Sequence, residues 1–402
     1  MKKQLLPFIS FLVFTGLIIF NNGCKNEINK TDYLNKVLKN LEKISSASYH
    51  SVMSFNLPGD TTRFTTYIWI KKEFENKADT TIGSSFAWFY PEDDSKMYLY
   101  YDGSARGHLD SDRKTVTIDS FKTNTLPFRP VGSPFFNKAK NILKYALETN
   151  DSISTELKDF GDSIRFILYI PHRVKYFFGK AVEMDNPYLL REDAFTRYEI
   201  WIDKSEGLPY KIIDKMPHNS GFEACNNLKL NKIRIEDFRP SDYFPPDYEV
   251  KVRGQQQRIF KDLTGKTAPD WTLTDYSENS IGLKNLHSKV LLIEFTGIGC
   301  APCHAAIPFI KQLVKEHEGR DFEFVSIETW GNDIEGLKRY HKNNELNYNL
   351  LKASENIVDR YEVSGVPAFY ILDRNHVIMK IITGYEKGTT DKEIRNAIKE
   401  LI

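Results

Sequence analysis

Two cysteines separated by two residues carry the clearest chemistry in this sequence. They form Cys300-Ala-Pro-Cys303, which follows the apolar run 290–295 and opens a stretch with helical spacing. A thiol in the first turn of a helix faces unsatisfied N–H groups and the positive end of the helix dipole, which lower its pKa and favour the thiolate. The second thiol is close enough to resolve a mixed disulfide formed on the first. The pattern predicts a redox-active disulfide, with Cys300 attacking and Cys303 resolving.

An acidic residue interrupts the apolar run before the cysteines. Glu294 lies six positions before Cys300. If its strand is buried beneath the dithiol, burial raises the pKa of the carboxyl group, which can then accept the proton of Cys303 near neutral pH. The alternative is an edge position at which Glu294 faces water.

Other chemistries could use the same cysteines. Cys300-Ala-Pro-Cys303-His304 also has the C-x-x-C-H spacing that attaches c-type haem, whereas without haem His304 is an exposed first-turn residue near the thiols. A structural zinc ion would need a second pair of ligands. A peroxiredoxin needs a Thr and a Pro at fixed distances before its cysteine, and they are not at those distances here. The sequence favours the dithiol, so we expect no metal and no cofactor.

The region around the cysteines alternates strands and helices. Apolar periodicity predicts strands at Val290–Phe295, Phe322–Ile327, Ala368–Leu372 and Val377–Thr383, and helices at Cys300–His317, Asp333–Asn344 and Asp391–Leu401. Continuous apolar runs are typical of buried parallel strands. The order strand–helix–strand, then a strand pair and a closing helix, predicts an α/β fold over residues 262–402.

These elements and several motifs together resemble the thioredoxin-like envelope disulfide reductases of the TlpA/ResA type. The motifs are the dithiol with Glu294, Pro308 within the following helix, Gly365-Val-Pro367, Lys266-Thr-Ala-Pro-Asp-Trp-Thr-Leu273, and Leu283 with Leu286-His-Ser-Lys289. The resemblance implies that Pro367 is cis, packs against the dithiol and shapes the substrate groove. It also implies that the partners are protein thiols or disulfides and an upstream redox protein. Gly299 replaces the Trp that usually precedes the first cysteine, so we expect wider access to Cys300.

The larger preceding region, residues 31–250, has mainly strand patterning. A helix is predicted from Thr31, with apolar residues repeating as far as Ile44, and a second helix at Phe136–Leu147. Strands are predicted at Tyr49–Phe55, Arg63–Lys71, Lys96–Tyr101, Arg113–Ile118, Ser163–Ile170, Tyr198–Ile202, Lys211–Met216 and Leu228–Ile235. This pattern predicts a large antiparallel sheet, open or partly closed into a barrel, that carries one or two helices.

We find no catalytic group in this N-terminal region. Its histidines, His50, His108, His172 and His218, lack the spacing of a zinc site, and Cys225 is interpreted as a buried apolar side chain rather than a reactive thiol. The opening helix, Tyr101-Asp-Gly103, the segment 198–211 and the closing segment 238–247 resemble the LolA/LolB-type lipoprotein-carrier fold. That resemblance implies an apolar ligand.

The first residues have the pattern of a targeting segment. Lys2 and Lys3 precede an apolar run over residues 5–20, followed by Gly23-Cys24. The run is shorter than the roughly 20 residues of a membrane-spanning helix. Gly23-Cys24 resembles a bacterial lipobox, which implies cleavage before Cys24 and its lipidation. An uncleaved short anchor and simple secretion are the alternatives, and all three place the body of the protein outside the cytoplasm, where dithiols can act as redox devices.

Length and charge complete the prediction. The 402 residues suggest two or three domains, which we place at 1–23 (signal peptide), 24–30 (tether), 31–250 (β-rich), 251–261 (linker) and 262–402 (thioredoxin-like). A net charge of +1 gives no electrostatic footprint for nucleic acid. The sequence therefore predicts a membrane-tethered thiol–disulfide oxidoreductase facing the periplasm. The alternatives are a binder of apolar ligands or lipoproteins in which the thioredoxin-like domain is regulatory, and a peroxiredoxin-like antioxidant.

Overall fold

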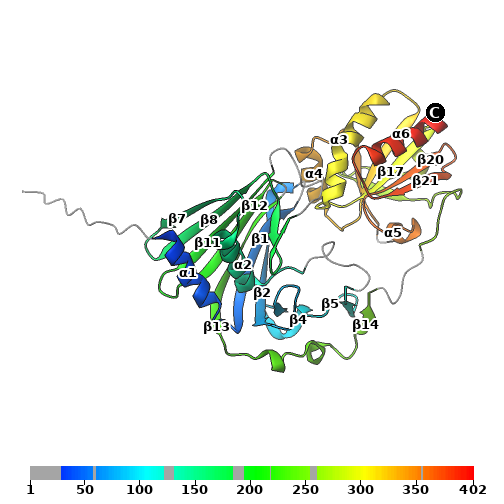
Figure 1. Cartoon of the computed structure of the whole chain (residues 1–402). Coiled ribbons are helices and arrows are strands. Elements are labelled where there is room, and N and C mark those ends of the chain that lie inside the picture. The colour runs from blue at the N-terminus through cyan, green and yellow to red at the C-terminus, as the bar shows by residue number, and fades with distance from the viewer. Residues whose placement is uncertain are drawn as a thin grey trace, which may run out of the picture.

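The chain folds around two large β-sheets, one in the N-terminal and one in the C-terminal part of the sequence (Figure 1). The computed structural model describes residues 29–57, 60–121, 131–183, 194–217, 219–253, 260–354 and 356–402. The predicted signal peptide, Cys24 and His218 lie outside these residues. Within them, no helix is both long and apolar enough to cross a membrane.

The N-terminal sheet has twelve strands in the order β14-β6-β5-β4-β3-β2-β1-β13-β12-β11-β8-β7, and a separate pair is formed by β9 and β10. The strands are β1 (Ser46–Leu57), β2 (Asp60–Glu75), β3 (Ser84–Tyr90), β4 (Asp93–Tyr101), β5 (Arg106–Asp110), β6 (Thr115–Asp119), β7 (Ser154–Asp159), β8 (Ser163–Pro171), β9 (Lys175–Phe177), β10 (Ala181–Glu183), β11 (Phe195–Asp203), β12 (Leu208–Met216), β13 (Asn219–Leu230) and β14 (Glu249–Val252). Neighbouring strands are antiparallel except β14 and β6, and β14 and β7 form the two edges. The mainly β, open sheet agrees with the prediction.

Several strands differ from the sequence prediction. β3 was not predicted because it is buried on both faces for most of its length and so lacks the alternation of apolar and polar residues. The strand predicted at 228–235 is instead β13, which begins nine residues earlier and ends at Leu230. Its first half contains Asn219, Ser220 and Gly221, residue types with low strand propensity, and pairing with β1 and β12 overrides that propensity.

The end of the N-terminal sheet also differs from the predicted boundary at residue 250. β14 lies parallel to β6, and the next residue, Arg253, donates its backbone N–H to the Ile118 carbonyl at 2.7 Å. The sheet therefore extends into the predicted linker 251–261. The polar residues of β14 fit an edge strand, whose outer side faces solvent.

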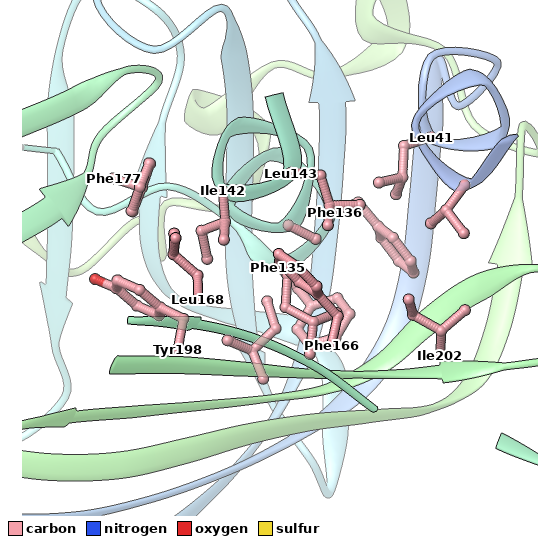
Figure 2. Packing of buried hydrophobic residues seen from close by; sticks show 14 of the residues in the cluster. Leu41, Phe135, Phe136, Ile142, Leu143, Phe166, Leu168, Phe177, Tyr198 and Ile202 are labelled. Carbon is pink, nitrogen blue, oxygen red and sulfur yellow. The ribbon is translucent and has the colours of Figure 1, made fainter. Parts of the chain in front are cut away.

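Two helices cover one face of the N-terminal sheet. α1 (Lys30–Leu41) and α2 (Phe135–Glu148) bury their apolar sides in a common core. Figure 2 shows Phe135, Phe136, Ile142 and Leu143 of α2 against side chains from β8, β9 and β11. α1 ends three residues before Ile44, the last residue of the predicted repeat, which still packs partly against this core.

The opposite face of β2–β6 is covered by the segment that follows β13. This segment contains the short 3-10 helices η1 (Ile235–Asp237) and η2 (Pro240–Tyr243). Its side chains Phe238, Tyr243 and Phe244 pack against the buried residues of that face. The closing segment that suggested the LolA/LolB resemblance thus has a structural role in this protein.

The C-terminal sheet has seven strands in the order β16-β15-β19-β18-β17-β20-β21. Its elements are β15 (Thr272–Asp275), β16 (Ser280–Gly282), η3 (Leu283–Asn285), β17 (Val290–Thr296), α3 (Ala301–Glu316), β18 (Phe322–Glu328), α4 (Ile334–Asn343), β19 (Asn349–Lys352), α5 (Ile357–Arg360), β20 (Ala368–Asp373), β21 (Ile378–Thr383) and α6 (Thr389–Leu401). The predicted strands and helices are present within one or two residues of their predicted ends. The unpredicted strands β15, β16 and β19 have three or four residues each, too few for a periodic signal.

β17 lies in the interior of this sheet, between β18 and β20. It runs parallel to β18 and antiparallel to β20, and all seven of its residues are buried. Val290 and Leu292 point into the core formed with α3, whereas Leu291 and Ile293 point into the core on the other face. A strand buried on both faces holds its last residues rigidly, and the dithiol follows directly from it.

Candidate active site

The two cysteines lie where β17 leads into α3. They form a disulfide, with their Cα atoms 5.2 Å apart. Cys300 is the N-cap of α3, and its Sγ atom accepts a hydrogen bond from the backbone N–H of Cys303 at 3.2 Å. Pro302 occupies the first turn, where its missing N–H leaves no helical hydrogen bond unmade. When the dithiol is reduced, the same N–H and the helix dipole favour a thiolate on Cys300.

The disulfide is almost covered by protein. Cys300 exposes 4% of its surface and Cys303 only 1%. Cys300 is therefore nearly covered in this oxidised state although Gly299 has no side chain, and the wider access expected from the missing Trp stays a prediction. Gly299 has a φ of 98°, a left-handed conformation that glycine adopts without strain, and the turn it forms holds Cys300 in the core.

Pro367 belongs to the loop beside the disulfide. The Val366–Pro367 peptide bond is cis, as the resemblance implies. The carbonyl oxygen of Val366 lies 3.8 Å from Cys300 Sγ. A disulfide sulfur has no hydrogen to donate, so this is a van der Waals contact in the oxidised protein, and it places the proline loop against the reacting atom.

Glu294 is buried in β17. Its side chain exposes 2% of its surface and lies on the face of β17 that Val290 and Leu292 share, the face covered by α3. The alternative of a water-facing edge position is therefore wrong. Ser326 of β18 donates a hydrogen bond to Glu294 Oε2 at 2.6 Å, whereas Oε1 has no hydrogen-bond partner among the described residues. Burial raises the pKa of Glu294 to about 7, and the Ser326 hydroxyl partly offsets that rise.

A second buried carboxylate, which the sequence reasoning missed, joins two loops at this end of the sheet. Glu328 ends β18 and exposes 1% of its surface. Its Oε1 atom accepts hydrogen bonds from the backbone N–H groups of Trp330 (3.0 Å) and Ile298 (3.4 Å), and Oε2 accepts one from the N–H of Asn332 (3.1 Å). The available signal was an acidic residue at the carboxyl end of a predicted strand, next to the end of β17.

The remaining candidate residues do not join this site. Cys225, on β13, is a free thiol that is buried, and its pKa is raised by burial and by the nearby Glu223 and Glu73 carboxylates, as expected of an inert cysteine. Within the described residues, no three His, Cys, Asp or Glu side chains gather closely enough to hold a metal ion.

The sequence comparisons agree with the fold and the disulfide. The profile described as the AhpC/TSA family matches residues 264–381. These residues contain the dithiol, its strand and the cis proline. The C-terminal region is a thioredoxin-like domain of this type, and the protein is a thiol–disulfide oxidoreductase.

Particular relatives carry the same assignment. The chain is 25% identical over 121 residues to a thiol-disulfide oxidoreductase ResA of Bacillus cereus, covering 30% of this chain and 69% of that protein. It is 24% identical over 136 residues to ResA of Bacillus subtilis (strain 168), covering 34% and 75%.

Solved structures are similar over the same share of the chain. One is a putative protein disulfide isomerase from Bacteroides thetaiotaomicron, with 24% identity, coverage of 35% of this chain and 92% of that one, and a TM-score of 0.31. Another is a putative thiol:disulfide interchange protein DsbE from Chlorobium tepidum, with 18% identity, coverage of 34% and 96%, and a TM-score of 0.32.

Proposed function

We propose that this protein reduces disulfides of other proteins in the bacterial cell envelope, and that a lipid on Cys24 tethers it to a membrane. The observation that carries the proposal is the Cys300–Cys303 disulfide at the start of α3, with the Cys303 N–H directed at Cys300 Sγ. The resemblance of the dithiol region to envelope disulfide reductases supports the reducing direction, and the ResA relatives are thiol-disulfide oxidoreductases. The Gly23-Cys24 pattern supports the tether.

The reaction proceeds through a mixed disulfide. The Cys300 thiolate attacks one sulfur of the client disulfide, the client S–S bond breaks, and the other client sulfur leaves as a thiolate. Cys303, once deprotonated, attacks Cys300 Sγ, so that the Cys300–Cys303 bond forms and the second client thiolate leaves. Two electrons pass from the dithiol to the client. A dithiol of an upstream redox protein then reduces Cys300–Cys303 again.

Glu294 and Pro367 assist this exchange. With a pKa of about 7, Glu294 is deprotonated in part near neutral pH and can take the proton from Cys303. That proton is then available to a client thiolate as it leaves. Pro367 keeps the neighbouring backbone against Cys300, where an extended client segment would lie.

This proposal does not depend on lipid binding by the N-terminal part. Its helices and sheet fill the space between them with side chains (Figure 2). A cavity beside Glu73 and Phe136 has a volume of about 20 Å³, room for a single water molecule. Binding of an apolar ligand therefore stays a prediction from the sequence resemblance.

Trapping of mixed disulfides in the full chain tests the assigned roles. Cys303→Ser should accumulate clients bound through Cys300, because the resolving attack is missing, and Cys300→Ser should accumulate few. Cys225→Ser is the matched control and should behave like the wild type. Non-reducing gels and mass spectrometry identify the adducts, and equal trapping by both active-site variants would refute the assignment.

The direction of electron flow has its own measurement. We expect a reduction potential near or below about −250 mV for the Cys300–Cys303 couple in glutathione redox buffers, as for reducing thioredoxins. A potential near about −120 mV is that of a strong oxidant and would reverse the proposed direction.

A further inference from the structure

Trp330 is an exposed aromatic residue beside the active-site turn. It follows β18 in the loop before α4, and 55% of its surface is exposed, more than for any other large hydrophobic side chain among the described residues. Single exposed apolar side chains are common on protein surfaces, so it is the position of this ring beside the dithiol turn that gives it significance. The family resemblance does not assign this residue.

The ring of Trp330 packs against the turn that carries Cys300. A Cβ atom placed on Gly297 would lie 2.5 Å from Cδ2 and 2.7 Å from Cε2 of the indole, so the ring rests on the backbone of this glycine. The carbonyl of Gly297 in turn accepts a hydrogen bond from the backbone N–H of Cys300 at 3.0 Å. Gly297 thus contacts both the indole of Trp330 and the backbone of the attacking cysteine, Cys300.

The backbone beneath Trp330 is fixed although its ring is exposed. Glu328 binds the N–H groups of Trp330 and Asn332 on one side and of Ile298 on the other. Thr329 adds two hydrogen bonds, from its N–H and its hydroxyl, to the Thr296 carbonyl, both at 2.9 Å. An aromatic ring on a fixed loop can bind a partner at little cost in conformational entropy.

We infer that Trp330 determines client specificity by packing against an apolar side chain next to the cysteine under attack. This inference rests on the proposed function and narrows its substrates to disulfides flanked by aromatic or large aliphatic residues. Gly299 offers no side chain, whereas Trp330 presents an exposed aromatic surface beside the turn that carries Cys300. One such contact should favour an apolar client about three- to tenfold.

Two peptide disulfides test the inference in the pre-reduced full chain. Each is a symmetric dimer, and the two differ only in Phe or Ser on both sides of the cysteine. The ratio of their reduction rates is the readout, because general damage to the dithiol slows both. We expect the wild type to reduce the Phe dimer about three- to tenfold faster, Trp330→Ala to lower the ratio to about one, and Trp330→Phe to restore it in part.

Two further variants separate a specific from a general effect. Gly297→Ala should lower the ratio because its Cβ displaces the indole while Trp330 is retained. Met379→Ala removes another exposed apolar side chain, on β21, and should keep the wild-type ratio. An unchanged ratio in Trp330→Ala, or a ratio of one in the wild type, overturns the inference and leaves the proposed function standing. A wild type that reduces neither dimer overturns both.

Discussion

Glu294 shows how one residue can combine a cost in stability with a chemical use. It is an acid in a strand whose other residues are all buried, and one of its oxygens has no hydrogen-bond partner within the described structure. Burying a carboxylate without a cation favours its neutral form, which is why the pKa rises to about 7. A group that exchanges its proton near neutral pH is what the resolving thiol needs.

The first prediction concerns the exchange rate. Glu294→Gln keeps the shape and the Ser326 contact but removes the proton acceptor, so disulfide exchange near pH 7 should slow by about tenfold or more. Ser326→Ala is an informative companion: it removes a hydrogen bond that favours the carboxylate, so it should move the pH–rate profile to higher pH. Stopped-flow rates from pH 6 to 9 measure both, and an unchanged Glu294→Gln profile would contradict the role of Glu294.

The second prediction concerns stability in the oxidised protein. The pKa of Glu294 rises from 4.5 to about 7 on folding, so as pH increases the unfolded chain loses this proton first. The folded state is therefore destabilised progressively between about pH 4.5 and 7, by up to about 3 kcal/mol, and no further above that range. Relative to the wild type, Glu294→Gln should gain stability from pH 5 to pH 8. Native-state hydrogen exchange of the β17 amides measures the stability of both proteins at each pH. Curves of stability against pH that run parallel for the variant and the wild type would exclude this gain.

At the scale of elements, helix α2 begins without a cap of its own. Its N-cap is Pro134, which makes no side-chain hydrogen bond. The N–H groups of Phe135 and Phe136 instead bind the Tyr49 hydroxyl and Glu73 Oε2, each at 3.2 Å, and Tyr49 donates to the same Glu73 oxygen at 2.8 Å. The sheet therefore supplies the polar groups that hold the helix start in the core.

A third prediction follows for α2. Glu73→Ala leaves the Phe136 N–H and the Tyr49 hydroxyl buried without an acceptor, which should cost about 2 kcal/mol or more. Glu73→Gln keeps an acceptor and should lose less. In the alanine variant, amide exchange in the first turn of α2 should become much faster, whereas exchange in β11 should change less. Equal protection in both variants would show that Glu73 does not hold the helix.

Elements differ in how far the sequence could predict them. The longer C-terminal strands and helices have clear apolar patterns, and Cys300, Cys303 and Pro367 carry local signals, so these elements were predictable to within two residues, whereas the short strands β15, β16 and β19 were not. β3 is buried on both faces and β13 contains polar residues, so pairing partners rather than local patterns determine them. Glu328 and Trp330 were missed because their importance depends on a neighbouring loop that is distant in sequence.

At the scale of the whole molecule, the proposed tether would decide where the dithiol operates. If Cys24 carries the lipid, the protein should partition into the detergent phase, since a diacylated residue has enough apolar surface for stable anchoring. Cys24→Ser should release the protein or leave it unprocessed. Detergent-phase separation combined with N-terminal sequencing measures the outcome, and normal cleavage with retained detergent partitioning in Cys24→Ser would disprove the anchor.

The burial of Cys225 also has a consequence for the whole molecule. Its sulfur lies in the other sheet, and the raised pKa keeps it protonated at the pH at which the dithiol reacts. Among the described residues, Cys300 thus has one intramolecular partner and cannot rearrange to a second. In electrochemical terms the described residues hold a single two-electron couple without a side branch. An encounter that reverses at the mixed disulfide restores the dithiol, and one that goes forward reduces the client and leaves the Cys300–Cys303 disulfide.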